Sequence, residues 1–366
     1  MIKCNNVQEQ ASDLSGLILK QWQSSLSAGD FVLGDEVAQF EAWMSRRCAG
    51  AHAISMNSGT DALILALRAL GIGAGDEVIT CSNTFVATVG AIVAIGAQPV
   101  LADVGADELI NVETIAPLLT ARTRAVIPVH LRGRPVDIDS VLDLCRARGI
   151  AVVEDCAQAI GTTMNGRQVG TSSDAAAFSL HPLKTLGGLG DGGVLVTTNP
   201  AIAEYARNAR NHGLLNRGES SVFGINSRLD TLQAAALNIK AQFLDQWIRR
   251  REEIAAFYDA MLADTRTGVD LGNKKNGSSY YHYVVRSGER DKLQQYLAEH
   301  DIQAMIHYPT PVHQQQAWLR SQPPVSLPMT DRLAREILTI PCHQHLADGD
   351  VEQIVEAIRR FDSRSR

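Results

Sequence analysis

The 366-residue sequence has no long uninterrupted apolar run, so it predicts no transmembrane helix. Its first six residues, Met1 to Asn6, contain no apolar segment of the kind that marks a secretory signal peptide. The formal net charge is −6, which argues against a polyanion such as DNA as a partner. We therefore expect a protein that acts on small molecules, and any phosphate that it binds must be held by a local site.

Cysteine pairs of the C-x-x-C type are also absent. The cysteines are scattered along the chain at Cys4, Cys48, Cys81, Cys145, Cys156 and Cys342. This scatter, in a chain of this length, predicts reduced thiols in a cytoplasmic protein. The segment Cys342-His343-Gln344-His345 offers three metal-binding side chains on one short loop, but a zinc site needs a fourth ligand and none is evident, so we expect no metal there.

Apolar residues make up 45% of the chain, enough for one large domain and a smaller one. Residues 50–200 alternate between short β-branched runs and helical patterns. The predicted strands cover 77–80, 99–102, 125–129, 150–153, 176–179 and 194–197, and the helices 61–70, 87–95 and 138–148. Such alternation predicts an α/β fold with a mostly parallel sheet covered by helices.

The regular alternation of predicted strands and helices ends at about residue 200. Helical patterns cover 201–211, a long stretch 228–262, and then 290–299, 331–338 and 348–361, with a strand-like run at 280–285. Two further helices are expected before the sheet, at 11–26 and 35–45. We predict a large α/β domain over residues 1–240 and a smaller C-terminal α+β domain over 241–366.

An acidic residue ends one of the predicted strands. The run Ala151-Val152-Val153-Glu154-Asp155 places Asp155 at the carboxyl end of a parallel strand, where open α/β sheets bind ligands. A carboxylate buried there needs a partner. From the residues alone, Asp155 either serves a ligand or caps the next turn.

A single lysine precedes a glycine-dense loop. Lys184 follows the strand that ends at Ser179 and comes just before the glycines of the segment 187–193. Glycine lets the main chain approach a ligand closely. Lys184 is therefore a phosphate contact, a nucleophilic amine or a solvated surface charge, and the pattern leaves the three open.

A short turn leads directly into a helix at Asn57-Ser58-Gly59-Thr60-Asp61. The free N–H groups and the positive dipole end of such a helix form a phosphate site, although an ordinary helix N-cap explains the same residues. A Walker A site is excluded because no Gly-Lys-Ser/Thr follows. A phosphate site, a strand-end acid and a loop lysine together match the needs of pyridoxal phosphate (PLP).

These residues lie in a longer series of ordered segments. The sequence resembles the DegT/DnrJ/EryC1/StrS family of sugar aminotransferases from about Gly29 to Ile358. The matching segments are 58–63, 83–85, 154–158, 179–184, 190–193, 211–213, 226–230 and 307–309. So many segments in one order make chance similarity improbable. The resemblance implies the three-layer fold of the aspartate aminotransferase type.

The resemblance also implies the roles of individual residues. Lys184 forms the Schiff base with PLP and then moves the proton, and Asp155 pairs with the pyridine nitrogen. Phe85 stacks on the ring and Gln158 binds near the ring hydroxyl. Without the resemblance, we would interpret Phe85 as a core aromatic residue and Gln158 as an amide in a turn. The phosphate is held by Gly59, Thr60 and Ser179, and by Asn226 of a neighbouring subunit, which implies a homodimer. Substrate is bound by His307, Tyr308 and Arg228.

The expected reaction moves an amino group from L-glutamate to a keto-sugar, most readily a nucleotide-linked keto-deoxysugar for a surface polysaccharide or a natural product. Alternatives are a free keto-sugar acid or cyclitol as acceptor, or a catalytically silent PLP-binding regulatory protein. A related sugar dehydratase would carry His in place of Lys184. The sequence departs from the family at Thr185, where members commonly have Asn, and at Arg132 and Arg134, which either read the substrate or are surface charges.

Overall fold

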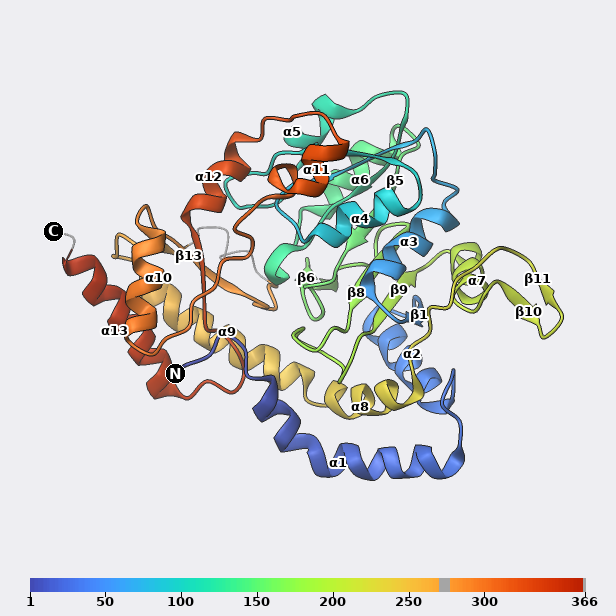
Figure 1. Ribbon diagram of the computed structural model, residues 1–366, viewed down its shortest axis with the longest axis horizontal. Coiled ribbons are helices and arrows are strands. Elements are labelled where there is room, and N and C mark those ends of the chain that lie inside the picture. Colours follow the sequence, from blue (N-terminus) through green and yellow to red (C-terminus); the bar gives the residue numbers. More distant parts are fainter. Residues whose placement is uncertain (270–276, 365–366) are drawn as a thin grey trace.

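The computed structural model describes residues 1–269 and 277–364 and is built around a seven-stranded sheet (Figure 1). The strand order is β1-β9-β8-β5-β4-β2-β3. Their bounds are β1 His52–Met56, β2 Glu77–Cys81, β3 Gln98–Ala102, β4 Thr123–Ile127, β5 Ala151–Asp155, β8 Ala175–Ser179 and β9 Gly193–Thr197. Within this sheet β9 runs antiparallel to both neighbours and the other pairs are parallel. The predicted mostly parallel sheet is confirmed.

Helices cover both faces of the sheet. Successive strand residues point to opposite faces, so Val153 packs into a core with helices α3, α4 and α7, and Val152 packs into another with α6. A third core joins the second face to α1, α2 and α8. These helices span α1 Val7–Ala28, α2 Asp35–Arg47, α3 Gly59–Ala69, α4 Val86–Ala94, α6 Ile138–Arg146, α7 Pro200–Ala209 and α8 Thr231–Ala241. The three-layer α/β class is thereby confirmed, and buried strands with apolar residues on both faces are its sequence signature.

Two of the predicted helices are wrong in extent. The stretch 228–262 forms two helices, α8 and α9 (Leu244–Met261), because the N–H groups of Gln242 and Phe243 bond to carbonyls three residues back and end the first helix. The helix predicted at 331–338 ends earlier: α12 covers Pro328–Glu336, and Ile337–Ile340 forms strand β14. All four residues of β14 are buried, and a short apolar run of this kind does not distinguish a helix from a strand.

The C-terminal part has its own small sheet. Strands β12 (Gly268–Val269), β13 (Tyr283–Arg286) and β14 pair antiparallel. Residues of β13 and β14 share a core with α9, α10 (Arg290–Glu299) and α13 (Asp348–Arg364). The predicted domain boundary at 240 falls close to the break between α8 and α9. However, Trp318 and Leu327 pack against Val89 and Leu101 of the large sheet's layer. The division into two domains therefore stays a prediction.

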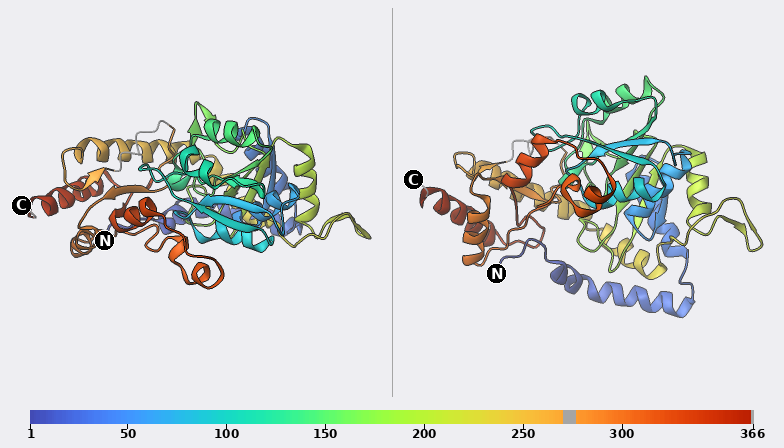
Figure 2. Two further views of the ribbon diagram at one scale, coloured as in Figure 1. Left: turned by 90° about the horizontal axis from the view of Figure 1, so that it is seen from above. Right: turned by 45° about the horizontal axis from the view of Figure 1, so that its top comes forward.

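Short elements complete the chain: α5 Val112–Ile115, β6 Thr163–Met164, β7 Arg167–Gln168, β10 Leu214–Asn216, β11 Glu219–Ser220 and α11 Gln316–Ser321. The β10–β11 hairpin projects away from the body of the molecule (Figure 2). All six cysteines are buried and unpaired. A search of residues 1–269 and 277–364 finds no helix both long and apolar enough to cross a membrane.

Candidate active site

A cavity of about 340 Å³ lies at the carboxyl ends of β5 and β8. The start of α3 forms one side of it, and the segments around residues 281 and 307 close the opposite side. The parallel strands converge here, which is where open α/β sheets bind their ligands. The cavity is lined by these residues from the sequence prediction: Gly59, Thr60, Phe85, Asp155, Gln158, Ser179, Lys184, His307 and Tyr308.

Asp155 ends β5 with a side chain that is only 5% exposed. Its Oδ2 accepts a hydrogen bond from the Thr88 hydroxyl at 2.8 Å, and its Oδ1 accepts one from the Ala157 N–H at 3.0 Å. Burial raises the pKa of Asp155, and those two bonds and the charge of Lys184 oppose the rise. A protonated ring nitrogen beside this carboxylate would supply the cation that a buried acid needs.

Lys184 lies in the turn after β8, where its N–H donates to the His181 carbonyl at 2.8 Å. Its Nζ stands 4.8 Å from the centroid of the Tyr281 ring. The side chain borders the cavity, but protein atoms surround the amine, and this burial lowers the pKa of Lys184 to about 8 against the opposing charge of Asp155. Lys184 is thus not a solvated surface charge, and near neutral pH a useful fraction of its amine is unprotonated.

The start of α3 has the geometry of a phosphate site. Ser58 is the N-cap of the helix, since its Oγ accepts the Asp61 N–H at 3.1 Å. A Cβ at Gly59 would lie 3.0 Å from the Ser179 Cβ, and one at Gly193 would lie 2.2 Å from the Ser58 backbone. A Cβ at Gly193 would overlap the Ser58 backbone and one at Gly59 would crowd Ser179, so the two glycines let the helix N-terminus and the end of β8 approach closely at the cavity.

Rings and an amide complete the cavity. Phe85 is 54% exposed although it is a large apolar side chain, and its ring centroid lies 5.8 Å from that of Tyr308. The Gln158 Nε2 donates to the Tyr308 hydroxyl at 3.0 Å, while its Oε1 accepts the Arg132 N–H at 2.6 Å. Phe85 therefore presents an open aromatic face to the cavity, and Gln158 is fixed in place.

Asn226 and Arg228 do not reach this cavity. Asn226 is exposed and its backbone pairs with that of Asn211, and the Arg228 Nη1 donates to the Asn211 Oδ1 at 2.9 Å. Within one chain, neither Asn226 nor Arg228 contacts the cavity, so the predicted roles of Asn226 at the phosphate and of Arg228 at the substrate stay predictions.

A stack of rings in the cavity wall escaped the sequence analysis. The His282 ring lies 4.1 Å from the Tyr281 ring on one side and 4.1 Å from the His307 ring on the other. Burial, followed by the charges of neighbouring cations, lowers the pKa of His282 well below its usual range and that of His307 to about 4. Within the described residues the buried His282 Nδ1 has no hydrogen-bond partner. The run Tyr280-Tyr281-His282-Tyr283 predicts the start of a strand, but β13 begins only at Tyr283, and Tyr281 and His282 lie in the segment before it.

Arg132 and Arg134 are neither surface charges nor part of the cavity lining. Both are 1% exposed, and each forms an ion pair with the buried Glu108, at 2.5 Å and 3.3 Å. The Arg132 Nη2 also donates to the His307 carbonyl at 2.9 Å. Arg132 thus joins the buried ion pairs with Glu108 to the segment that carries His307 and Tyr308.

One group of possible metal ligands occurs in the described part of the chain, namely His130, Glu154 and Cys156. The His130 Nδ1 accepts the Val136 N–H at 3.0 Å, so its Nε2 carries the proton and donates to Glu154 at 2.7 Å. Burial would raise the pKa of Glu154, but this bond and those from Ser173 and Gly170 outweigh it and lower the pKa. The group is a satisfied hydrogen-bond network.

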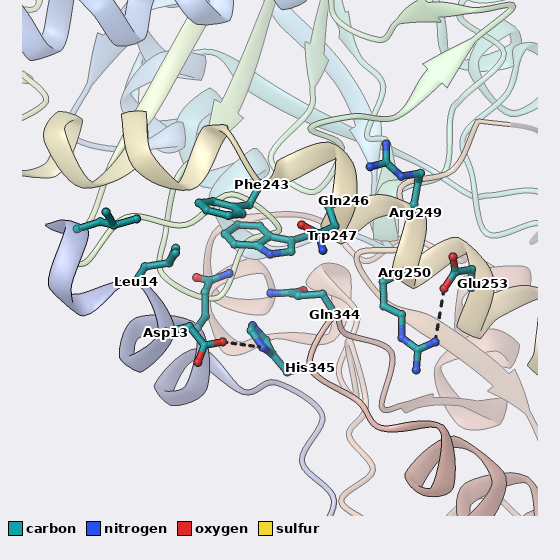
Figure 3. A pocket seen from close by; sticks show the side chains of 12 residues that line it. Asp13, Leu14, Phe243, Gln246, Trp247, Arg249, Arg250, Glu253, Gln344 and His345 are labelled. Atoms are coloured by element: carbon teal, nitrogen blue, oxygen red, sulfur yellow. Dashed lines mark hydrogen bonds and ion pairs between the residues drawn. The ribbon is translucent and has the colours of Figure 1, made fainter.

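A larger cavity of about 610 Å³ lies between α1 and α9 (Figure 3). Phe243 and Trp247 stack at 6.1 Å along it, and the His345 Nδ1 lies 3.6 Å from Asp13. None of the predicted site residues lines it. Size alone therefore does not identify the active site, and the chemistry lies in the smaller cavity.

The residues of the smaller cavity fit PLP. They offer an acid for the ring nitrogen, an open aromatic face, a helix N-terminus with a close-packed glycine for the phosphate, and a half-buried amine of lowered pKa. The fold and this site define a PLP-dependent aminotransferase.

Comparison with known proteins supports the assignment as a PLP-dependent aminotransferase. Residues 13–359 match the DegT/DnrJ/EryC1/StrS aminotransferase family, and the chain belongs to it. It is 41% identical to the dTDP-3-amino-3,4,6-trideoxy-alpha-D-glucose transaminase of Streptomyces venezuelae, over 93% of this chain and 90% of that one. It is also 41% identical to the erythromycin biosynthesis sensory transduction protein EryC1 of Saccharopolyspora erythraea, over 91% and 92%. The crystal structure of S. venezuelae DesV in complex with a ketimine intermediate superposes with a TM-score of 0.96 at 38% identity, covering 99% of this chain and 98% of that one.

Proposed function

We propose that the protein transfers the amino group of L-glutamate to a keto-sugar, a nucleotide-linked keto-deoxysugar in amino-sugar biosynthesis. One observation carries the proposal: a lysine amine of lowered pKa and a buried carboxylate line the same cavity. The nature of the acceptor is supported by the relative that is named a dTDP-amino-sugar transaminase.

When bound, PLP supplies an aldehyde for covalent attachment and a ring that takes up electrons from the bond being broken. Asp155 would hold a proton on the ring nitrogen, which is the positive charge that its buried carboxylate lacks. Phe85 would cover the ring face, and Gln158 would bind at the ring hydroxyl. Gly59, Thr60 and Ser179 would hold the phosphate at the start of α3.

Lys184 would both bind the cofactor covalently and move a proton. Burial lowers the pKa of Lys184 to about 8, and its side chain borders the cavity in which the donor would bind. The Nζ would take the proton from the α-carbon of glutamate and return it to the cofactor's side, and in the second half-reaction it would act in reverse. A base tuned to near the working pH is the efficient choice for such transfers.

The substrate would meet the ring-lined wall of the cavity. His307 and Tyr308 border it, whereas Arg228 would act from outside this chain's own cavity. Because burial keeps the pKa of His307 near 4, His307 is neutral at pH 7 and would bind a sugar hydroxyl without adding charge.

The functional unit in this proposal is a homodimer with shared active sites. Asn226 is exposed and does not line the cavity of its own chain, which supports a role at the phosphate site of a second subunit. A cytoplasmic location is proposed on the six unpaired, buried cysteines.

The experiment that tests the acceptor uses purified protein loaded with pyridoxamine phosphate and a panel of keto-sugars. The panel contains nucleotide-linked keto-deoxysugars, free keto-sugar acids and cyclitol ketones. We expect return of the pyridoxal form of the cofactor with a nucleotide-linked sugar and an aminated product of matching mass. Return with only the free acids or cyclitols would overturn the nucleotide-sugar proposal.

A regulatory function is the second candidate, because one close relative is named a sensory transduction protein. The retention of Lys184 and Asp155 in one cavity favours the enzyme. A regulatory protein would hold PLP but would leave it unchanged on addition of glutamate.

A further inference from the structure

Helix α8 carries a buried lysine. Lys240 is 2% exposed, and its Nζ donates to the carbonyl of Gly187 at 2.8 Å. Across residues 1–269 and 277–364, no acidic side chain forms an ion pair with Lys240. Burying an ammonium group without a counter-ion costs free energy. The hydrogen bond from Lys240 to the loop after Lys184 offsets part of this cost and suggests a function for the buried lysine.

A second residue of α8 contacts the same loop. Gln233 lies seven residues before Lys240, two turns earlier on the same side of the helix. Its Oε1 accepts the Leu189 N–H at 2.8 Å. A Cβ at Gly188 would lie 2.9 Å from that oxygen, and one at Gly190 would lie 2.8 Å from the Gln233 Nε2. The Gln233 side chain therefore joins α8 to this loop, and the two glycines allow the close approach.

The loop is also fixed to its own strand. The Gly188 N–H donates to the Leu180 carbonyl at 2.7 Å, and the Lys184 N–H donates to the His181 carbonyl at 2.8 Å. A Cβ at Gly187 would lie 2.4 Å from the Pro182 carbonyl oxygen. Lys184 thus lies within a tight turn, and Lys240 holds the carbonyl three residues beyond it.

We propose that Lys240, assisted by Gln233, is a positioning residue that sets the place of Lys184 in the cavity. This inference rests on the proposed role of Lys184. With the loop held against α8, the Lys184 amine stays 4.8 Å from the Tyr281 ring and enclosed by protein. If the Gly187 carbonyl loses its hydrogen bond to Lys240, the turn becomes more mobile and the Lys184 amine becomes more exposed to water. Hydration stabilises the protonated form of this amine and so raises its pKa.

The test uses Lys240→Met in the full-length protein freed of cofactor. PLP is added at a series of pH values, the covalent link is fixed with borohydride, and the modified lysine is located by peptide mass spectrometry. No amino donor is present, so turnover does not enter the readout. We expect the midpoint for Lys184 capture to rise from about 8 towards 10.5, the value of an ordinary lysine. We also expect the Kd of PLP, measured near the wild-type midpoint, to rise roughly tenfold, because a larger share of the Lys184 amine is then protonated and unable to form the covalent link.

Matched variants separate positioning from general stability. Lys240→Arg keeps a cationic donor and should hold the midpoint near that of the wild type. Lys292→Met removes a lysine whose side chain is 75% exposed and should change neither quantity. Gln233→Ala removes only the Leu189 contact, at an exposed stretch of the loop, and should shift the midpoint upward by less than Lys240→Met does.

The outcomes are distinguishable. If Lys240→Met folds, melts at a lower temperature and captures PLP with an unchanged midpoint and Kd, Lys240 is structural only and the inference is overturned. If Lys240→Met does not fold, Gln233→Ala decides, and an unchanged midpoint there overturns the inference. If the wild-type protein itself links no PLP to Lys184, the proposed function fails, independently of Lys240.

Discussion

The two walls of the active-site cavity are built by different means. The wall formed by β5, β8 and α3 supplies charge and backbone N–H groups at the ends of regular elements. The opposite wall supplies stacked rings, held from behind by the buried Arg132–Glu108 pair. The first wall is suited to the cofactor and the proton, the second to the shape of the substrate. Substitutions in the first wall should therefore cost far more activity than substitutions in the second.

Lys184→Ala should have the largest effect, because it removes both the covalent attachment and the base. We expect at least the roughly 10²–10⁴-fold loss typical of a missing general base, together with complete loss of the borohydride-fixed link to PLP. Steady-state rates and peptide mass spectrometry measure the two effects. Turnover at the wild-type rate in this variant would show that another amine binds PLP and transfers the proton.

Asp155→Asn should cause the second-largest loss of activity. The amide occupies the same volume but carries no negative charge for a protonated ring nitrogen, so transition-state stabilisation is lost. We expect kcat to fall roughly 10²–10⁴-fold while the melting temperature without cofactor changes little or rises, because the pKa of Asp155 is already raised by burial. A rate within threefold of the wild type would mean that the acid is structural.

Mixing two inactive proteins tests whether the first wall is completed by a second subunit. Lys184→Ala and Asn226→Asp are each expected to be inactive, the second because its carboxylate repels the phosphate. In a mixed dimer with shared sites, one site carries both changes and the other neither, so up to about half of the wild-type activity per heterodimer returns. With subunit exchange demonstrated, the absence of any recovery would place Asn226 within its own chain's function.

Tyr281→Leu should have the smallest effect and sharpens the role of the second wall. The Tyr281 ring lies under the Lys184 ammonium, and a contact of this kind favours the charged amine by about 0.5–1 kcal/mol. Its loss should lower the midpoint for PLP capture by about half a pH unit, opposite in sign to the effect of Lys240→Met. Tyr281→Phe keeps the ring and is the control. A higher midpoint in Tyr281→Leu would show that hydration of the cavity outweighs the ring.

The cofactor wall could be predicted from sequence because each of its groups sits at a regular boundary. Asp155 ends an apolar strand, Ser58 caps a helix, and Lys184 comes just before a cluster of glycines. These signals are local, and the family resemblance joined them into one site. The burial of Arg132 and Arg134 could not be predicted, because their partner Glu108 lies on another loop and only the fold brings them together.

The ring stack and the break between α8 and α9 also escaped prediction for physical reasons. Tyr281, His282 and His307 come from segments about 25 residues apart, and aromatic residues in a strand pattern usually indicate a core. Apolar residues continue at helical spacing across Phe243, so the pattern gives no sign of the break. Such features depend on tertiary contacts that periodicity does not record.

The most direct test of the proposed transamination follows nitrogen from donor to acceptor. The PLP-loaded protein is given ¹⁵N-labelled L-glutamate and a nucleotide-linked keto-deoxysugar, and 2-oxoglutarate and the sugar product are quantified by mass spectrometry. We predict equal amounts of 2-oxoglutarate and ¹⁵N-labelled amino sugar, and neither product with Lys184→Ala. Stable PLP binding with no 2-oxoglutarate formed, with or without the sugar, would contradict the proposal and favour a regulatory protein.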